Sequence, residues 1–509
     1  MFASMKSMGL LGVDGFIVTV EADLSQGLPG FDVVGLPGAA VRESRDRVRS
    51  ALKNCGFSYP VSRITINLAP ASIKKEGSVY DLPLLLAILI ASGQLDNTLQ
   101  DSACIGELSL AGELRPINGV LPMVIAARDA GLRRVFVPAG NAAEGAVVDG
   151  IEVYPVQTVM QLILHLTGQV PLLPVKPDAF PQSADIAAPD FADVMGQAAA
   201  RRAMEIAAAG GHNILLIGPP GSGKSMLAKR LPSILPDLTP EEALEATKIH
   251  SIAGVLPGGV GLLRHRPFRA PHHNISVAGL TGGGAIPHPG EVSLAHHGVL
   301  FLDELPEFPR ASMESLRQPL EDGIVTISRA HASLSYPCQF MLVAAMNPCP
   351  CGFFGHPTRP CICSQAAVQN YLSRVSGPLL DRIDLHIEVP PVEFEQLSAK
   401  TKSECSADIR ARVNDARQIQ LCRFEGTGIL SNAHIPVSRL HEWCVLTDDA
   451  QGLLKMAFDK MGLSARAYDR LLKVARTIAD LDHSEKIEYL HVAEAVQYRG
   501  LDRKYWQNR

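Results

Sequence analysis

The sequence predicts an α/β protein of several domains, and three observations support this prediction. Its 509 residues exceed the length of a typical domain of roughly 150 residues about threefold. An apolar fraction of 47% and a charged fraction of 19% are typical of a globular chain and exclude a disordered one. Short apolar runs typical of strands alternate with amphipathic helical stretches, as they do in α/β domains.

Charge, hydropathy and cysteine content exclude several classes of protein. The net charge of −5 excludes a globally basic coat for nucleic acid, so any site for a polyanion must be a local patch. The longest apolar run, 82–91, is shorter than the roughly 18 residues of a membrane span, and 1–11 does not resemble a signal peptide. Ten cysteines are too sparse for a disulfide scaffold. We therefore expect a soluble, cytoplasmic protein without a membrane partner.

The chain is predicted to divide into three domains and a linker. Residues 1–168 carry β-like runs at 15–20, 64–68, 102–110 and 134–137 and an amphipathic helix at 40–55, which predicts an α+β domain. Residues 169–190 form a linker punctuated by Pro171, Pro174, Pro177, Pro181 and Pro189. A second domain, 191–390, and a helical third domain, 391–509, follow; the best amphipathic helix is 465–481.

The second domain is expected to contain a parallel sheet. A helix is predicted at 198–209 and a short strand at 213–217. The runs 299–302 and 340–345 are apolar at every position, which is typical of strands covered by helices on both faces of a parallel sheet.

A phosphate-binding loop follows the strand at 213–217 and opens a helix. It matches the pattern G-x-x-x-x-G-K-[ST] with Gly218, Pro219, Pro220, Gly221, Ser222, Gly223, Lys224 and Ser225. In this pattern backbone N–H groups surround the phosphates of a nucleotide, the lysine reaches the β- and γ-phosphates, and the hydroxyl holds Mg²⁺. The motif therefore predicts that Mg-ATP is the cofactor.

Two further strand ends are expected to complete the chemistry of hydrolysis. The strand 299–302 ends in Asp303 and Glu304, which are predicted to hold Mg²⁺ and to activate the attacking water, respectively. The strand 340–345 leads to Asn347, which could orient the same water; the alternative is a turn-forming residue before Pro348.

Two insertions are candidates for contact with DNA. The segment 264–273 holds Arg264, Arg266 and Arg269 beside three histidines and a phenylalanine, which suits phosphate contact and base stacking. The alternative is a segment that packs against a neighbouring subunit. Residues 324–329 and 333–340 predict a hairpin with Arg329 and His331 near its tip.

Four cysteines occur as two Cys-x-Cys pairs. Cys349, Cys351, Cys361 and Cys363 flank a loop of nine residues and could hold a structural zinc ion in a tetrahedron of thiolates. The alternative is a group of buried or redox-active thiols. Because the pairs follow Asn347, the zinc would brace that loop.

These motifs resemble the Walker A, Walker B and sensor 1 elements of AAA+ ATPases. The segment 376–384 resembles the arginine-finger segment of the magnesium-chelatase and MCM branch. The resemblance implies that Arg382 reaches the γ-phosphate of a neighbouring subunit and that Arg466 is the sensor 2 arginine. The alternative for Arg382 is an ion pair with Asp381 or Asp384.

The N-terminal domain resembles the proteolytic domain of Lon-type proteases. Segments 76–81 and 106–119 carry the resemblance, which covers residues 2 to about 166. By that match the catalytic serine falls on Val79 and the lysine on Met123, and neither side chain can perform serine–lysine chemistry. Ser78 is one position away from the nucleophile. We therefore expect no protease activity.

The whole chain is similar to the YifB/ComM family of magnesium-chelatase-like ATPases. The resemblance implies a Lon-like α+β domain, an AAA+ core and a helical lid. It also implies a hexameric, ATP-driven DNA motor or helicase that promotes branch migration, which in transformable bacteria helps to integrate incoming single-stranded DNA. Single-stranded or branched DNA would be the partner, with other recombination proteins possible. The alternatives are a motor subunit for a metal chelatase, an ATP-dependent protease, or a protein-remodelling ATPase that gates a partner.

Overall fold

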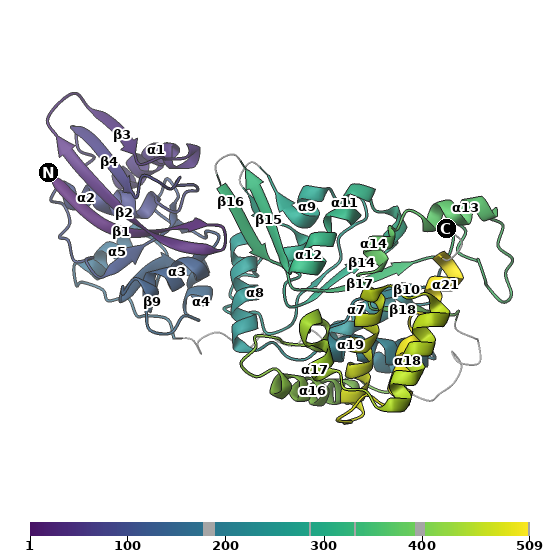
Figure 1. Cartoon of the computed structure of the whole chain (residues 1–509). Coiled ribbons are helices and arrows are strands. Elements are labelled where there is room, and N and C mark those ends of the chain that lie inside the picture. Colours follow the sequence, from purple (N-terminus) through teal and green to yellow (C-terminus); the bar gives the residue numbers. More distant parts are fainter. Residues whose placement is uncertain (177–188, 285–286, 330–331, 392–402, 507–509) are drawn as a thin grey trace. The chain divides into compact units, whose positions relative to one another are not determined.

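The computed structural model describes residues 1–176, 189–284, 287–329, 332–391 and 403–506. The chain divides into two compact units (Figure 1). Unit 1 comprises Met1–Ala184, Pro240–Leu263 and Ser328–Ser335, and unit 2 comprises Asp185–Thr239, Arg264–Ile327 and Tyr336–Arg509. The three segments of each unit alternate along the chain, so the chain passes between the units five times. Among the described residues, no helix is long and apolar enough to cross a membrane.

Unit 1 is built on a sheet of seven strands in the order β3-β4-β2-β1-β5-β8-β9. β1 and β2 form a long antiparallel pair that begins with Phe2 opposite Asp23, and β4 is antiparallel to β2. The remaining neighbours are parallel. The bounds are β1 Phe2–Leu11, β2 Asp14–Ser25, β3 Gly30–Val34, β4 Arg63–Ala69, β5 Ser102–Cys104, β8 Arg134–Pro138 and β9 Glu152–Val156; a small hairpin pairs β6 Glu107–Leu108 with β7 Leu114–Arg115.

The helices of unit 1 cover this sheet. The apolar run of the sequence forms α2 (Asp81–Ala91), whose residues are nearly all buried, so the run is a core helix. α1 (Ala39–Asn54) is amphipathic and buries one face that includes Val41, Val48 and Leu52. The others are α3 Val120–Asp129, α4 Ala142–Gly145, α5 Val159–Leu166 and α8 Pro240–Ala253.

Helix α8 belongs to unit 1, although its residues come after the phosphate-binding loop in the sequence. The Ser251 hydroxyl donates to the Glu144 carboxylate, and the Gly119 amide donates to the Ser251 carbonyl at 3.0 Å. A Cβ on Gly254 would meet the Asn118 side chain at 2.5 Å. Burial raises the pKa of Glu144, although the hydrogen bond from Ser251 opposes this shift. The loop and helix of unit 1 therefore fit closely against α8.

Unit 2 contains a sheet of five strands in the order β11-β14-β17-β10-β18, and every neighbouring pair is parallel. β10, β14 and β17 are buried along their whole length, as strands with both faces covered should be. The bounds are β10 Ile214–Ile217, β11 Phe268–Arg269, β14 Val299–Leu302, β17 Met341–Met346 and β18 Leu385–Glu388.

Helices and one small hairpin accompany this sheet, and a second hairpin starts and ends in unit 2 while its residues 328–335 belong to unit 1. Figure 1 shows α16, α17, α18 and α19 gathered on one side of unit 2. Their bounds are α16 Ser406–Arg423, α17 Leu440–Trp443, α18 Asp448–Met461 and α19 Ala465–Leu481. The others are α6 Ala198–Gly210, α7 Lys224–Arg230, α9 Val277–Thr281, α10 Glu291–Leu294, α11 Arg310–Ser315, α12 Arg317–Asp322, α13 Gln365–Leu372, α14 Gly377–Leu380, α20 Tyr489–Gln497 and α21 Leu501–Trp506; the hairpins pair β12 Gly282–Gly283 with β13 His288–Pro289 and β15 Ile324–Arg329 with β16 Ala332–Pro337.

A buried ionic network fixes the C-terminal helices. Asp480 on α19 is 1% exposed and accepts hydrogen bonds from Arg423, Arg476 and Asn432. Arg476 is itself 1% exposed and also donates to two backbone carbonyls in the loop after α19. One carboxylate therefore compensates two guanidinium groups.

The predicted fold class agrees with the structure, and the differences are local. The expected strand 102–110 is divided into β5 and β6 by Gly106, whose φ of 156° interrupts the extended run. The second strand of the hairpin after α12 is Ala332–Pro337, which begins one residue earlier and ends three residues earlier than expected. The boundaries at 168, 190 and 390 stay predictions.

Candidate active site

The predicted nucleotide-site residues meet at one edge of the parallel sheet of unit 2. β14, β17 and β10 are consecutive neighbours, and each ends at the residues that the motifs single out. Because parallel strands place their carboxyl ends at the same edge, Gly218, Asp303 and Asn347 come together there.

The phosphate-binding loop runs from Gly218 to Gly223 and leads into α7, whose first residue is Lys224. Gly221 and Gly223 have φ values of 77° and 91°, a region that glycine adopts without strain. A Cβ at Gly218 would lie 2.3 Å from the Val389 carbonyl oxygen, so only glycine fits there. These glycines leave the backbone N–H groups of the loop accessible.

Lys224 contacts both the loop and the end of the neighbouring strand. Its Nζ donates to the carbonyls of Gly218 at 2.8 Å and Pro219 at 2.9 Å, and to Asn347 Oδ1 at 3.2 Å. Burial lowers the pKa of Lys224, while the negative charges of Asp303 and Glu304 act in the opposite direction. The ammonium group is thus held among oxygen atoms at the base of the loop.

The residues predicted to hold Mg²⁺ and to activate water lie beside it. The Ser225 hydroxyl donates to Asp303 Oδ2 at 2.6 Å, so the two oxygens lie close enough to share one small cation. Glu304 has a φ of 53°, which is uncommon for a residue with a side chain and is typical of functional sites. Its Oε2 lies 3.5 Å from His273 Nδ1. The sequence indicated His273 only as part of the basic segment, and no spacing rule connects it to Glu304.

The donor set fits Mg-ATP. The loop offers backbone donors, a lysine and an accessible turn, and the Ser225–Asp303 pair offers the oxygen ligands that Mg²⁺ prefers. Within the described residues, the buried Ser222 hydroxyl has no hydrogen-bond partner in this loop, so it is a further polar group available to a ligand.

The structure gives Arg382 a partner that the sequence did not indicate. Arg382 is 6% exposed and pairs with Glu321, whereas Asp384 pairs with Arg470 at 3.3 Å. Arg466, at the start of α19, has a side chain 62% exposed, and its Nη2 lies 3.9 Å from Glu321 Oε1. The roles of Arg382 and Arg466 in ATP hydrolysis remain predictions.

The candidate DNA contacts differ in their surroundings. Arg264 is exposed. Arg266 donates to the backbone carbonyls of residues 236, 237 and 297, and Arg269 forms a two-point ion pair with Glu291 at 2.6 and 2.8 Å. Arg329 is the last residue of β15, and His331 lies outside the described residues.

The four cysteines cluster closely enough for a metal ion. The thiol sulfurs lie within 4.8 Å of one another, with separations of 3.3, 3.5 and 3.7 Å among Cys349, Cys351 and Cys361. Tetrahedral Zn–S bonds of about 2.3 Å place the sulfurs about 3.8 Å apart, so Cys349, Cys351, Cys361 and Cys363 fit zinc. We call them the cysteine cluster.

The loop of the cysteine cluster packs against the phosphate-binding loop. A Cβ at Gly352 would lie 2.4 Å from Pro220 Cδ, so the two loops touch where glycine leaves room. On the other side, α13 follows the cluster, and Tyr371 on that helix hydrogen-bonds the backbone of Asn347. The cluster therefore lies between two parts of the nucleotide site.

The two positions to which the Lon resemblance assigns the catalytic serine and lysine are core residues. Val79 and Met123 are 8% and 1% exposed and belong to the hydrophobic core. The Ser78 hydroxyl, one position away, donates to Glu107.

Comparisons with known proteins show which family the chain resembles. The family described as "Magnesium chelatase, subunit ChlI" matches residues 190–397, "Subunit ChlI of Mg-chelatase" matches 20–141, and "Magnesium chelatase, subunit ChlI C-terminal" matches 403–499. The competence protein ComM of Haemophilus influenzae is 45% identical over 98% of each chain. YifB of Escherichia coli K12 is 45% identical over 97% of this chain and 96% of its own.

The N-terminal unit has a second similarity. The Lon protease of Mycolicibacterium smegmatis is 28% identical over 168 residues, which is 31% of this chain and 21% of that protein. The parallel sheet, its loop and the near full-length identity together identify the chain as a member of the ComM/YifB family of magnesium-chelatase-like AAA+ ATPases.

Proposed function

We propose that this protein is a hexameric, ATP-driven DNA motor that promotes branch migration of recombination intermediates. ATP hydrolysis is supported by two hydrogen bonds at one edge of the sheet, from Lys224 to Asn347 and from Ser225 to Asp303. The DNA part is supported by the 45% identity to a protein named for competence, the state in which bacteria take up DNA.

Each residue at the sheet edge has a role in this proposal. Lys224 binds the β- and γ-phosphates. Ser225 and Asp303 would hold Mg²⁺, which would neutralise charge on the phosphates. Glu304 accepts the proton of the attacking water, while Asn347 orients that water. Arg382 of a neighbouring copy stabilises transition-state charge, so hydrolysis depends on assembly of the ring.

Contact with DNA is assigned to the basic side chains of the insertions. Arg264 is exposed and Arg329 ends a hairpin strand, so these two are the leading candidates for phosphate contact. Arg269 and Arg266 have partners within the chain, and for them the stabilisation of the segment 264–273 is the simpler role. The cysteine cluster is proposed to hold structural zinc that braces the phosphate-binding loop and the Asn347 loop.

The first experiment measures ATP hydrolysis without DNA and with single-stranded, linear duplex and branched DNA. Stimulation by single-stranded or branched DNA that is lost in Lys224→Ala supports the motor. The removal of one phosphate-binding lysine should lower turnover by about a hundredfold or more, because a charge-stabilising contact of the transition state is lost.

A second candidate function is favoured by the family description itself. The match of 190–397 to a magnesium chelatase subunit fits an ATPase that drives metal insertion or remodels a protein partner. That function predicts hydrolysis that no form of DNA changes. Turnover independent of DNA would therefore reject the DNA motor and retain the ATPase.

A further inference from the structure

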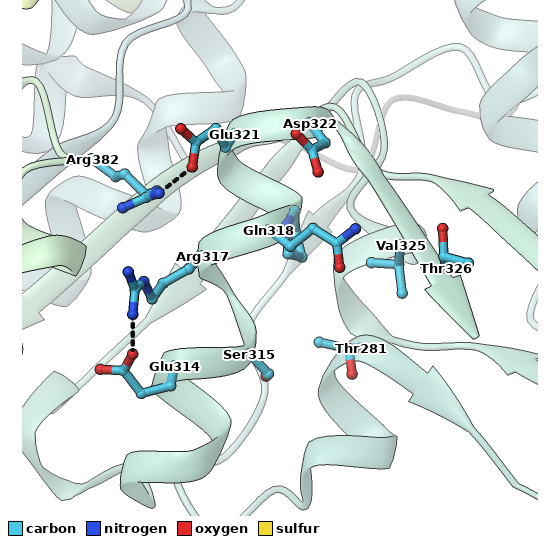
Figure 2. Close-up of a pocket in the computed structure, with 11 residues that line it drawn as sticks. Thr281, Glu314, Ser315, Arg317, Gln318, Glu321, Asp322, Val325, Thr326 and Arg382 are labelled. Atoms are coloured by element: carbon cyan, nitrogen blue, oxygen red, sulfur yellow. Dashed lines mark hydrogen bonds and ion pairs between the residues drawn. The ribbon is translucent and has the colours of Figure 1, made fainter. Parts of the chain in front are cut away.

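A cavity of about 550 Å³ lies in unit 2 between α12, α11 and the first strand of the β15–β16 hairpin. Figure 2 shows two ion pairs on one wall of it, Arg382 with Glu321 and Arg317 with Glu314. The cavity lining is mostly polar, with three carboxylates and two arginines among its residues. It therefore brings the predicted arginine finger to the same wall as an acidic helix.

Glu321 faces both arginines for which the family resemblance implies a role at the nucleotide. Arg382 pairs with its Oε2, and Arg466 lies 3.9 Å from its Oε1, so each carboxylate oxygen faces a different arginine. The hydrogen bond from Arg382 and the charges of Arg382, Arg466 and Arg470 hold the pKa of Glu321 below its usual range. Glu321 is therefore ionised and can compete with phosphate for these arginines.

Within the described part of the chain, Arg382 does not have all of its N–H donors hydrogen-bonded beside Glu321. Nη1 donates to the Pro378 carbonyl at 2.8 Å and Nη2 donates to Glu321. Among the described residues, its buried Nε has no hydrogen-bond partner. A buried donor without a partner costs free energy, so the arginine has an unused donor that a phosphate oxygen could satisfy.

Glu321 is also close in sequence to the base of the hairpin. It is the penultimate residue of α12, which ends at Gly323 with a φ of 65°, and β15 starts at Ile324. The Gly323 carbonyl accepts a hydrogen bond from the Cys338 amide at 2.8 Å, just beyond the second strand. Glu321 therefore lies two residues before the backbone hydrogen bond that joins the two ends of the hairpin.

We propose that Glu321 is a positioning residue that holds Arg382 and Arg466 until phosphate displaces it. When Arg382 turns to a neighbour's nucleotide, the carboxylate is released and the base of the β15–β16 hairpin is free to shift. The same exchange links nucleotide state to the hairpin that the DNA motor would use. This inference rests on the proposed function for the role of Arg382 in the ring.

The test compares Glu321→Gln with the native chain in steady-state ATP hydrolysis, with and without single-stranded DNA. Loss of the competing charge should lower the KM for ATP and raise turnover without DNA by about three- to fivefold, the effect expected of an ion pair whose carboxylate is half exposed to water. The ratio of turnover with DNA to turnover without DNA should fall by the same factor, because the maximal rate with DNA is unchanged. Adding Arg382→Ala to Glu321→Gln should abolish the gain.

Glu314→Gln is the control, because it breaks a carboxylate–arginine pair on the same wall of the cavity, 2.9 Å apart, whose arginine, Arg317, is partly exposed rather than buried. It should retain native turnover and KM. Thermal unfolding shows whether Glu321→Gln folds. If it does not fold, Glu321→Asp takes its place, because aspartate keeps the charge but shortens the side chain. Glu321→Asp should give a smaller increase in turnover.

Several results would overturn the inference. These are unchanged turnover and KM in Glu321→Gln, an equal gain in Glu314→Gln, or a gain that survives Arg382→Ala. If DNA fails to stimulate the native chain, the DNA motor is rejected, while the rate and KM without DNA still decide the role of Glu321.

Discussion

The contact between the cysteine cluster loop and the phosphate-binding loop predicts that Gly352→Ala weakens ATP binding. Gly352 has a φ of 82°, and the new methyl group would lie 2.4 Å from Pro220 Cδ, where ordinary contacts begin near 3.4 Å. About 1 Å of displacement is thus required, and the rigid proline ring cannot rotate away. Either the cysteine cluster loop or the phosphate-binding loop must therefore move.

The expected loss of ATP affinity follows from two separate free-energy costs of the substitution. A side chain at positive φ costs about 1–2 kcal/mol, and forcing an extra methyl group into a packed contact costs about 1–3 kcal/mol. Gly355→Ala in the same loop carries the first cost alone, because its φ is 75° and the nearest atoms are 3.9 Å away on the flexible Lys504 side chain. The difference between the two variants therefore measures the clash.

A fluorescent ATP analogue titrated into the purified chain measures this difference. If ATP binding requires the native position of the phosphate-binding loop, the clash opposes binding. Gly352→Ala should then bind the ATP analogue about 5- to 150-fold more weakly than Gly355→Ala. Both variants should show a similar loss of thermal stability from backbone strain. Equal ATP affinity in the two variants would refute the inference that the cysteine cluster loop supports the nucleotide site.

Three further predictions concern stability, metal and pH. Asp480→Asn should destabilise unit 2 by about 3–5 kcal/mol in urea unfolding followed by tryptophan fluorescence, because the buried Arg476 and the partly buried Arg423 lose their counter-charge; Asp482→Asn, half exposed, should cost at most about 1 kcal/mol. Metal analysis should find about one zinc per chain, and Cys361→Ser should lower both zinc content and ATP affinity; an unchanged zinc content would contradict the tetrahedral site. Burial lowers the pKa of His165, whose Nδ1 accepts the Leu172 amide at 3.0 Å, so its neutral form contributes stability above about pH 6.5 that is lost as the pH falls through the lowered pKa. His165→Gln should flatten the decline of the unfolding temperature between pH 7.5 and 5, and an unchanged slope would contradict this assignment.

The parts of the site that follow local rules could be predicted from sequence. Strand β14 and helix α19 have the bounds that their apolar patterns predicted, and the phosphate-binding loop lies between its predicted strand and helix. Parallel strands then bring Asp303 and Asn347 to that loop without any further information.

Contacts between distant segments could not be predicted in this way. Arg382 pairs with Glu321, 61 residues earlier, whereas the ion pair considered from the sequence, as the alternative to a role at the nucleotide, was with Asp381 or Asp384. The expectation for 1–11 concerned only a signal peptide, and these residues form β1, which is defined by its ten-residue pairing with β2. Ion-pair partners and strand neighbours depend on tertiary packing, which has no local signature in a single sequence.

Because α8 belongs to unit 1, the protein cannot be cut at the linker into two independently folded fragments without loss of contacts. A fragment that starts after the linker would retain α8 but lose the Glu144 carboxylate and the Asn118 loop that it fits. The apolar contact of Leu244 with the core of unit 1 would then face water. Unit 1 thus contains segments from both sides of the linker. Cleavage within the linker should therefore leave two fragments that remain associated rather than an independent ATPase.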